Sequence, residues 1–542
     1  MKKSLGMKKT ILGLAMATVM QFSATDVLAE PNQLSDARVR QAIAYAIDMD
    51  TIAETLLEGK AIAADSMIPN GAFKAEGLNA YKYDPDKARA LLKEAGWDKS
   101  QVLDVVYYYG DQLTADLMVA LQAYLGDVGI EMTYRKLEGD VGEQLNVLPP
   151  ENSDTSAVKW DIAYGAKAAL ALQEYYNGYR SNLNSYTPAN PEIDALIDGI
   201  NASVDAEKQI AAFAEFEKYE NEALSDIPLY YQQLFIYESN RINRNGGLYG
   251  NAQFNYDWGI VDWTVEPDAD GKKIIYTNTA PSSFFQHPLL NPGLYIYSKV
   301  VFDRLVSVNG SLVPVAGQMA ESYEVAEDGM SVSFKLKDGL TWHDGEALTA
   351  DDVAWTLGAT LQVPAISAVI SNTLNSIEGS AAFIDGSAES MSGVTVDGNN
   401  ISITFAKLDP NFMLSFGQMA ILPKHLLSDM NPLEFQQHPF WQNPIGSGPF
   451  KIAEVQMNDF VRFVPFEDYH GGVAKIDEIV AFPSGDNDAN VLKNAGANRL
   501  DFGFTKSVGD VKGLEEMDHM RVIPADIPYT RSLRVNKFAN KP

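Results

Sequence analysis

The chain has 542 residues and no cysteine. Disulfide bonds, thiol catalysis, zinc sites with cysteine ligands and lipid attachment to a cysteine are therefore excluded. With 46% hydrophobic residues, a chain of this length can bury large cores without covalent cross-links. The composition predicts a protein with two or three sizeable cores that are held together by packing alone.

Positive charge is scarce. There are 42 Lys and Arg residues against 72 Asp and Glu, and the formal net charge is −30. Such a field repels nucleic acid and anionic membranes, so we expect neither as a partner. Two interpretations of the acidic surface stay open: attraction of cationic ligands, or simple solvation in a saline habitat.

Long apolar runs are missing after the first 30 residues. Residues 1–29 have a Lys-rich start, an apolar run from Ile11 to Met20, and Val27 to Ala29 before Glu30. These features are typical of a secretory leader cut after Ala29, and the run is too short to span a bilayer. The sequence predicts a soluble protein of the periplasm without a lipid anchor.

Motifs of catalysis are missing as well. There is no phosphate-binding loop, no dinucleotide fingerprint and no His-x-x-x-His pair. Ser447 stands between glycines, but Ile445 and Pro449 do not fit the turn of a nucleophilic serine. His343 and Asp344 lack the further ligands that zinc needs, and a β-turn with a packed Trp explains them better. We predict no enzyme, no cofactor and no metal site.

What the chain does contain is an alternation of helical and strand patterns. Strand, helix and strand over 102–137 predict a parallel pair with a right-handed crossover. Residues 266–272 form a polar, turn-rich break. Helices are expected at 36–58, 85–95, 113–125, 191–199 and 205–223, and strands at 102–109, 131–137, 160–164, 227–237 and 274–279.

A set of short motifs runs through the chain. They are VFDRL at 301–305, MAESY at 319–323, FKLKDG at 334–339, WHDG at 342–345, LTADDV at 348–353, LPKH at 422–425, IGSGPF at 445–450 and YHGG at 469–472. Each is weak alone, but as a set they resemble the extracellular solute-binding proteins of family 5, the peptide/nickel type. The resemblance covers almost all of residues 31–542, in two blocks.

The two blocks stand in swapped order. In the resembling family, a strand that ends near an Asn and a Pro leads into a helix of the form DxRVRQAIAYAID. Here Asn536 and Pro542 close the chain, whereas the matching helix begins at Asp36. The chain therefore resembles a circular permutant of the family, with 266–272 as the join between the ancestral ends.

The resemblance implies an α/β fold of the periplasmic-binding-protein type, type II, in the large subclass with an extra subdomain. Two lobes would surround a hinge. The implied division is a signal peptide at 1–29, a second ligand-binding lobe at 30–225, a return segment at 226–265, the linker at 266–272, the first lobe at 273–312 and 431–542, and the extra subdomain at 313–430.

The ligand region implied by the resemblance follows Trp160. In the family, a Gly-Trp pair there leads to an Asp that holds a peptide's α-amino group. Gly165 is retained, but Ala166 replaces the Trp and no Asp-Pro follows, so the α-amino anchor stays open. Lys167 would meet a ligand carboxylate, Glu174 would supply a carboxylate, and tyrosines would form a wall. The expected ligand-binding residues are Tyr164, Gly165, Ala166, Lys167, Gln173, Glu174, Tyr175 and Tyr176, with Phe284 and Phe285 from the other lobe.

The hinge is expected at Asn32, Ile227, Pro228, Asn536 and Pro542. If the chain is permuted, one of the two connections between the lobes, from 542 to 31, would be open, and we expect a wider range of lobe angles and weaker ligand binding.

The function that the resemblance implies is that of a monomeric solute-binding protein of an ABC importer. It would capture an oligopeptide or similar small solute and deliver it to a permease in the inner membrane. Two other classes stay open at this point. One is a secreted hydrolase on an unrelated two-domain fold, and the other is an engineered, permuted binding scaffold.

Overall fold

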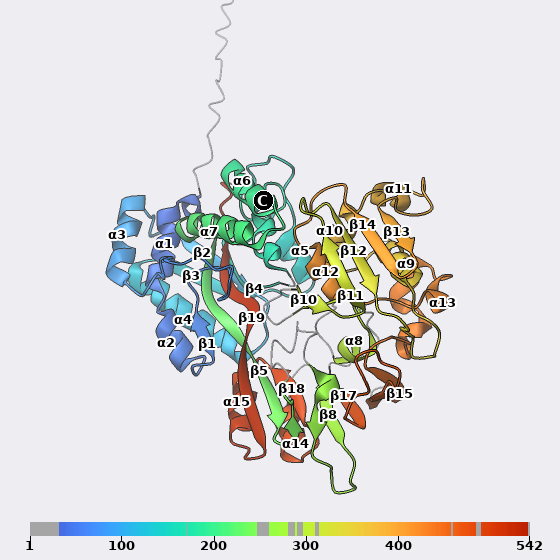
Figure 1. Ribbon diagram of the computed structural model, residues 1–542. Coiled ribbons are helices and arrows are strands. Elements are labelled where there is room, and N and C mark those ends of the chain that lie inside the picture. The colour runs from blue at the N-terminus through green and yellow to red at the C-terminus, as the bar shows by residue number, and fades with distance from the viewer. Residues whose placement is uncertain are drawn as a thin grey trace, which may run out of the picture.

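The computed structural model describes residues 32–169, 171–246, 259–279, 288–289, 296–308, 314–456, 459–483 and 489–539. One mixed sheet of 11 strands extends through both lobes of this α/β protein (Figure 1). Its strands, in spatial order, are β15 (Phe450–Gln456), β16 (Phe460–Pro465), β17 (Glu478–Pro483), β8 (Ile274–Thr279), β18 (Phe502–Thr505), β5 (Asp226–Ser239), β19 (Met520–Val535), β4 (Ile162–Ala168), β2 (Val102–Tyr107) and β3 (Glu131–Lys136), with β1 (Ala61–Ala63) beside β5.

The second lobe contains β1 to β4 and has helices on both faces of the sheet. Along β4, Ile162 and Tyr164 point to one core, and Ala163 points to the opposite side with Trp160. The core of Ile162 is covered by α1 (Ala37–Ala46), α2 (Met49–Thr55), α3 (Pro85–Ala95) and α4 (Gln112–Val128). The other side carries α5 (Val141–Asn146), α6 (Pro191–Ile200), α7 (Ala206–Ala223) and the 3-10 turns η2 (Leu172–Tyr175) and η3 (Asn177–Tyr179).

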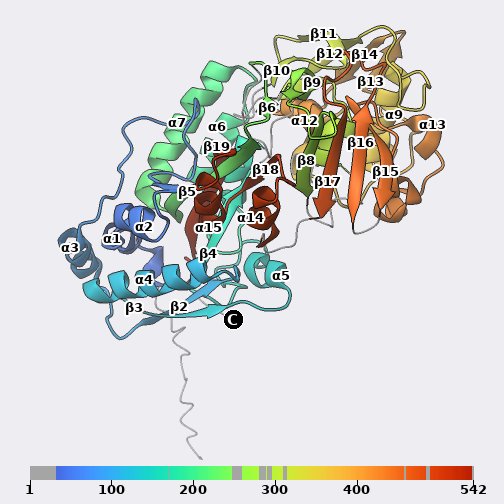
Figure 2. The same cartoon turned by 90° about the horizontal axis from the view of Figure 1, so that it is seen from below.

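The first lobe contains β8 and β15 to β18, and the extra subdomain packs on it through one continuous core. Figure 2 shows this half of the molecule beside the second lobe. The helices of the first lobe are α8 (Ile296–Val301), α14 (Ala489–Gly496) and α15 (Val508–Glu515). The subdomain has a sheet of β11 (Ala320–Val325), β12 (Ser331–Leu336), β14 (Asn400–Thr404) and β13 (Val394–Asp397), with α9 (Ala350–Leu361), α10 (Ala368–Ser376), α11 (Ser380–Ile384), α12 (Phe412–Gln418) and α13 (Lys424–Leu427).

Short elements complete the description. Strands β9 (Val306–Val308) and β10 (Pro314–Gly317) form a pair at the entry to the subdomain, and β6 (Ile242–Asn243) pairs with β7 (Thr264–Val265). No helix in the described part of the chain is both long and apolar enough to cross a membrane.

Two long strands, β5 and β19, pass from one lobe to the other. They pair antiparallel over most of their length, and the register shifts between Asp526 and Thr530. Beyond this shift, β5 pairs with β18 in the first lobe, and β19 pairs with β4 in the second. We call residues 230–233 and 526–531 the crossing segment.

Strand directions converge on the crossing segment. In the second lobe, β2, β3 and β4 run parallel to β5, which leads toward the first lobe. In the first lobe, β8, β17 and β18 run in the opposite direction. The carboxyl ends of both sets therefore point toward the crossing segment, and ligands of open α/β sheets bind at such ends.

The described ends of the chain meet in the second lobe, as the predicted circular permutation requires. The Asn32 side-chain amide donates to the carbonyl oxygens of Asn536 at 2.8 Å and Phe538 at 3.0 Å. Both β5 and β19 have already crossed between the lobes before this point. The expectation that one connection is open is therefore wrong, because the chain is interrupted inside one lobe and both crossing strands are continuous.

The division of the chain also differs at its C-terminal end. Leu533 and Val535 pack in the core of the second lobe, although 431–542 was assigned to the first lobe. Similarly, Ile227 and Tyr230 belong to the second-lobe core, whereas the return to the first lobe was placed at 226. The reason is that a strand shared by two lobes contributes to both cores.

Local predictions can be compared directly with the structure. The parallel pair of β2 and β3 is confirmed, as are α3 and the strand at 274–279. The single helix expected at 36–58 is wrong. It is divided into α1 and α2 because Ile47 is extended and the Asp48 carboxylate accepts from the Thr51 amide at 3.0 Å, which starts a new helix.

Candidate functional site

The crossing segment presents two faces because side chains alternate along a strand. Thr530 lies opposite Tyr231 on one face, and Arg531 lies opposite Tyr230 on the other. The polar surroundings of these two faces differ, and together they form the candidate site.

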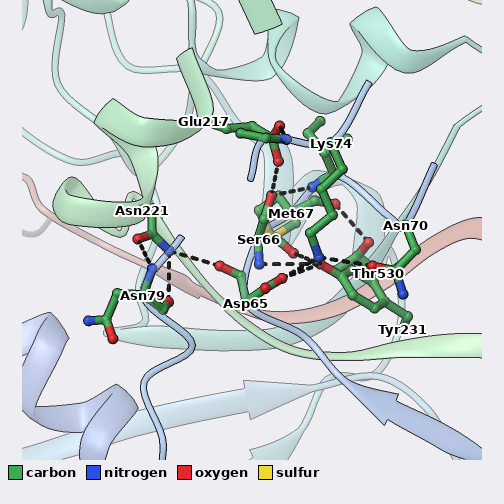
Figure 3. Close-up of polar contacts among 12 residues, drawn as sticks. Asp65, Ser66, Met67, Asn70, Lys74, Asn79, Glu217, Asn221, Tyr231 and Thr530 are labelled. Carbon is green, nitrogen blue, oxygen red and sulfur yellow. Dashed lines mark hydrogen bonds and ion pairs between the residues drawn. The ribbon is translucent and has the colours of Figure 1, made fainter. Parts of the chain in front are cut away.

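The first face is braced by residues 64–79, which we call the bracing loop (Figure 3). Thr530 donates its hydroxyl to the Met67 carbonyl at 2.8 Å. The Tyr231 hydroxyl lies 3.1 Å from the Asp65 carboxylate and 3.0 Å from the Ser66 carbonyl. Lys74 donates to the Tyr231 hydroxyl at 2.7 Å and forms an ion pair with Asp65. The crossing segment is thus tied to the second lobe by side-chain contacts.

Helix α7 holds the other side of the bracing loop. Glu217 accepts from the Ser66 hydroxyl and the Ala75 amide, each at 2.5 Å, and Asn221 donates to the Asp65 and Asn79 carbonyls at 2.9 and 3.0 Å (Figure 3). Burial raises the pKa of Glu217 to about 7, although its hydrogen bonds act in the opposite direction. The desolvation of the carboxylate therefore outweighs the bonds that favour its charge.

The second face carries a cluster of cations and tyrosines. Arg531 donates Nε to the Gln232 side chain at 2.8 Å, and its guanidinium lies 4.0 Å from the centre of the Tyr109 ring. Its Nη1 atom is buried and has no hydrogen-bond partner among the described residues. We call Tyr109, Tyr164, Tyr230, Lys506, Tyr529 and Arg531 the cation–tyrosine cluster.

The cluster is drawn from both lobes. Lys506 follows β18 of the first lobe, and its ammonium lies 4.6 Å from the centre of the Tyr529 ring. Burial, with a contribution from Arg531, lowers the pKa of Lys506 to about 8. Tyr164 and Tyr230 share a hydrogen bond of 2.9 Å between their hydroxyls, and burial raises both of their pKa values. Burial thus keeps Tyr164 and Tyr230 neutral, so these two side chains do not offset the positive charge of Arg531.

This arrangement is suited to an anionic group. A guanidinium with an unpaired nitrogen, near a second cation and largely removed from water, offers charge-assisted hydrogen bonds to a carboxylate. Its position at converging strand ends is where such sheets bind ligands. No group of three or more His, Asp or Glu side chains in the described ranges is placed to hold a metal ion.

A cavity of about 420 Å³ lies between the second lobe and the subdomain. A Cβ atom added to Gly329 of the subdomain would lie 2.8 Å from Val204 of the second lobe, so the two bodies are in contact there. The residues that line the cavity are Phe73, Leu172, Tyr176, Val204, Ala206, Gln209 and Phe213 from the second lobe, and Pro314, Tyr323, Val325, Pro410, Asn411, Phe412, Met413 and Leu414 from the subdomain.

The structure brings only part of the predicted ligand residues to this region. Tyr164 belongs to the cation–tyrosine cluster, and Ala166 lies opposite Arg531 in the sheet. Gly165 packs against Tyr108, since a Cβ on it would lie 3.4 Å from that ring. Tyr176 lines the cavity, and its hydroxyl donates to Asn201 at 3.1 Å.

Other predicted residues are used inside the second lobe. Lys167 donates to the Tyr175 carbonyl at 2.8 Å and lies over the Tyr179 ring, so its ammonium has contacts inside the second lobe. Tyr175 is fully buried in the core under α6 and α7, which corrects its assignment to an open wall. Glu174 accepts from the Ala171 amide at 3.2 Å. The Gln173 side chain, Phe284 and Phe285 lie outside the described residues.

The predicted hinge residues also lie within the second lobe. Asn536 is buried and donates its side-chain amide to Trp160 and Ser156, at 3.0 and 3.1 Å. Ile227 is in the second-lobe core and Pro228 pairs with Ser532. Asn32 binds Asn536, as described above, and Pro542 is outside the described residues. The pairing of β5 with β19 has two register shifts, one between Asp526 and Thr530 and one between Arg531 and Ser532, and the second falls where Ser532 pairs with Pro228.

Sequence reasoning missed Arg531 and Lys506. Both lie at polar positions among apolar and aromatic residues, in the stretches 502–506 and 527–533. A charged residue within a mostly apolar stretch was the available signal. Whether such a residue belongs to a site depends on which strands lie next to it, and the sequence does not show this.

Comparison with known proteins gives a family. The model of "Bacterial extracellular solute-binding proteins, family 5 Middle" matches residues 10–191 and 314–538, which is more than half of the chain. The match falls in two separate blocks, in agreement with the rearranged order that the sequence predicts.

Individual relatives match over shorter stretches. The dipeptide-binding protein of Escherichia coli (strain K12) is 27% identical over 235 residues, 41% of this chain and 42% of the relative. The oligopeptide-binding protein AppA of Bacillus subtilis (strain 168) is 27% identical over 208 residues, 38% and 35% of the two chains. This chain thus spans less than half of the length of either relative. The structure of the AppA protein of Bacillus subtilis with a nonapeptide has 22% sequence identity and a TM-score of 0.34, with 42% of each chain covered.

Proposed function

We propose, from the premise that this chain belongs to the bacterial extracellular solute-binding proteins of family 5, that it captures a small solute between its lobes and delivers it to an ABC permease. Members of this family bind solutes and are not enzymes, so the prediction of a non-enzymatic protein is confirmed. The work of such a protein is binding energy that favours the closed arrangement of two lobes.

The observation that carries the proposal is the cation–tyrosine cluster at the crossing segment. Arg531 belongs to the second-lobe half of β19, and Lys506 belongs to the first lobe. An anionic solute that binds both cations would be held by both lobes at once. Such a solute interacts more strongly with closed than with open lobes, and this difference in affinity is what shifts the equilibrium toward closure.

For the solute we propose an oligopeptide or a similar small molecule with a carboxylate. Two relatives are named for dipeptides and oligopeptides, which supports this class. The unpaired Nη1 of Arg531 supports recognition of a carboxylate. The cluster as defined contains no acidic side chain, but Asp111 lies near enough to Tyr164 and Tyr230 to contribute to their raised pKa values.

The location belongs to the proposal too. A secretory leader at residues 1–29, which lie outside the described part, would take the chain to the periplasm as a soluble, monomeric protein. A permease in the inner membrane would receive the solute there. Cell fractionation of the full chain, with and without residues 1–29, tests this location directly.

The test of function is a thermal-shift screen of the protein without its leader against peptides, nickel chelates and sugars. A ligand at a hundredfold excess over its dissociation constant should stabilise the folded state by about 2.7 kcal/mol. We expect short peptides to raise the melting temperature and peptide amides, which lack the carboxylate, to raise it less. The proposal is wrong if no solute class shifts the melting temperature, or if a hydrolysis assay shows turnover of the peptides.

A further inference from the structure

We infer that the 420 Å³ cavity between the second lobe and the subdomain is an apolar subsite, which receives a large aliphatic or aromatic side chain of the solute. The inference rests on the proposed function and deepens it by naming the class of peptide that is captured. It is independent of the cation–tyrosine cluster, since no residue of that cluster lines the cavity.

The lining of the cavity is apolar and aromatic. Five aromatic rings contribute, from Phe73, Tyr176, Phe213, Tyr323 and Phe412, together with several aliphatic side chains. Two of the polar side chains in the lining, Tyr176 and Gln209, are paired within the protein. The Tyr176 hydroxyl donates to Asn201, and the Gln209 amide donates to the Ser203 carbonyl at 3.0 Å. The Tyr323 hydroxyl and the Asn411 amide add two polar groups to a lining that is otherwise mostly hydrocarbon. Such a lining favours an apolar group and disfavours a charged one.

The cavity has the size of a ligand site. Pockets for small molecules typically measure about 300–1,000 Å³ and are mostly apolar with a few polar groups. Empty space of this kind inside a single core would lower its packing density and cost stability. Here the space lies between two bodies, so its walls can separate and close around a guest.

Helix α7 supplies one wall through a single face. Ala206, Gln209 and Phe213 recur at the spacing that places side chains on one side of a helix. The opposite wall is subdomain backbone and side chain, from Pro410 to Leu414. A side chain seated here would contact both bodies only when they are closed, which again links binding to closure.

The cavity is close enough to the crossing segment for one peptide to reach both. The Ala169 amide donates to the Pro528 carbonyl at 3.0 Å, and Leu172, which lines the cavity, follows three residues later. Three residues of chain span at most about 10 Å. Phe73 precedes Lys74 of the bracing loop, so that loop also extends from the crossing segment to the cavity. A peptide of a few residues covers such a distance.

The experiment compares peptides and cavity variants by titration calorimetry. The peptides are Ala-Ala-Ala and nine variants of it. In each variant, one Phe, Leu or Asp replaces the first, second or third Ala, so each residue type gives three isomers. Ala206→Trp fills the cavity from an exposed position in the first turn of α7. Lys208→Trp adds the same side chain to an exposed position on another side of that helix and is the matched control.

We expect one Phe or Leu isomer to bind the unmodified protein at least tenfold more tightly than Ala-Ala-Ala, and its Asp counterpart to bind more weakly. Burial of a large apolar side chain gives roughly this factor or more. Ala206→Trp should abolish the preference and leave Ala-Ala-Ala binding within about threefold, while Lys208→Trp should keep the preference. Thermal melts of both variants, within a few degrees of the unmodified protein, show that they fold.

The two proposals fail in different ways. If Ala-Ala-Ala and the isomers all bind with one affinity, or if the preference survives Ala206→Trp, the apolar subsite is wrong while solute binding stands. If no peptide binds, the peptide proposal itself is wrong and the subsite is overturned with it.

Discussion

The two faces of the crossing segment differ in how completely their polar groups are paired. On the face of Tyr231 and Thr530, the hydroxyls of these two residues and the Lys74 ammonium have partners in the bracing loop. On the face of Arg531, a buried nitrogen has none among the described residues. Both faces belong to the same pair of strands. We therefore attribute the difference to their roles, with the first face stabilising the fold and the second binding the solute.

A paired network and an unpaired cation have different consequences. Removing one member of a satisfied, buried network leaves its partners without hydrogen bonds and costs stability. A cation with a buried, unpaired nitrogen is incompletely compensated for its loss of water, so its replacement by an apolar group should cost little stability. The comparison therefore predicts that changes on the first face lower stability, whereas changes on the second lower affinity for the solute.

The largest expected effect concerns Glu217, which anchors the bracing loop. Its pKa is raised from 4.5 in the unfolded chain to about 7 in the folded one. The folded state therefore holds the proton more tightly, and stability falls as the pH rises through this window. Between about pH 4.5 and pH 8 the loss is on the order of 3 kcal/mol. Lys74 and Asp65 lie near the carboxyl group and act in opposite directions.

Urea unfolding of Glu217→Gln at about pH 5 and pH 8 measures this effect. The variant should lose most of the pH dependence, because an amide does not titrate. Glu215→Gln, on an exposed position of the same helix, is the control and should keep it. An unchanged pH dependence in Glu217→Gln would show that this carboxyl group does not titrate in the window.

A smaller loss of stability is expected for Tyr231→Phe. The change removes a hydroxyl that contacts Asp65, Ser66 and Lys74, and leaves buried polar groups unpaired. The expected cost is about 2 kcal/mol in chemical unfolding. Tyr83→Phe, at a site that is 41% exposed, should cost little. Solute affinity should stay within a few fold, and a large loss of affinity without loss of stability would contradict the division between the faces.

On the other face, Arg531→Met should lower solute affinity roughly tenfold or more, which corresponds to about 1.4 kcal/mol or more. Its melting temperature without solute should stay equal or rise, because an incompletely paired cation is replaced by an apolar group. Calorimetry with the best peptide checks the affinity. Lys512→Met removes an exposed positive charge and should leave affinity unchanged. A lower melting temperature with unchanged affinity would make Arg531 a structural residue.

The smallest effect is expected when the order of the chain is restored. Linking Pro542 to Pro31 and opening the chain within 267–270 moves the interruption from the second lobe to an exposed turn. Both crossing strands are continuous in either form, so we expect solute affinities within about twofold. The two forms can be compared by calorimetry. Tighter binding by tenfold in the relinked form would mean that the position of the ends limits closure.

Much of the fold could be predicted where local signals agree. Helix α3 begins after Asp84 with Pro85 at its first turn and ends at Gly96 in the left-handed conformation, and each of these residues favours that role. The break between α1 and α2 was not predicted because the apolar spacing continues through it. Only the cap formed by Asp48 marks the break, and an Asp in that position is also compatible with one long helix.

The site was less predictable because burial depends on distant segments. Tyr175 and Tyr176 are neighbours of one type and both pack in the core under α6 and α7, yet only Tyr176 also borders the cavity. Lys167 is expected to meet a ligand carboxylate, but the chain turns back after β4 and the Lys167 ammonium donates to the Tyr175 carbonyl, eight residues later. The surroundings of Arg531 include Tyr109, which is distant in sequence, and Lys506, which belongs to the first lobe. Its place in the site could therefore not be predicted from neighbouring residues.

The position of β19 in the sheet has a consequence for how the molecule folds. This strand, residues 520–535, lies between β4 and β5, which are made some 300 residues earlier. The central sheet of the second lobe therefore has a gap until the end of the chain is synthesised. Contacts so distant in sequence make folding slow. Hydrogen-exchange experiments during refolding should show early protection of the subdomain amides and late protection of the β4 amides. A chain that folds so late remains extended long enough to be threaded through a narrow pore.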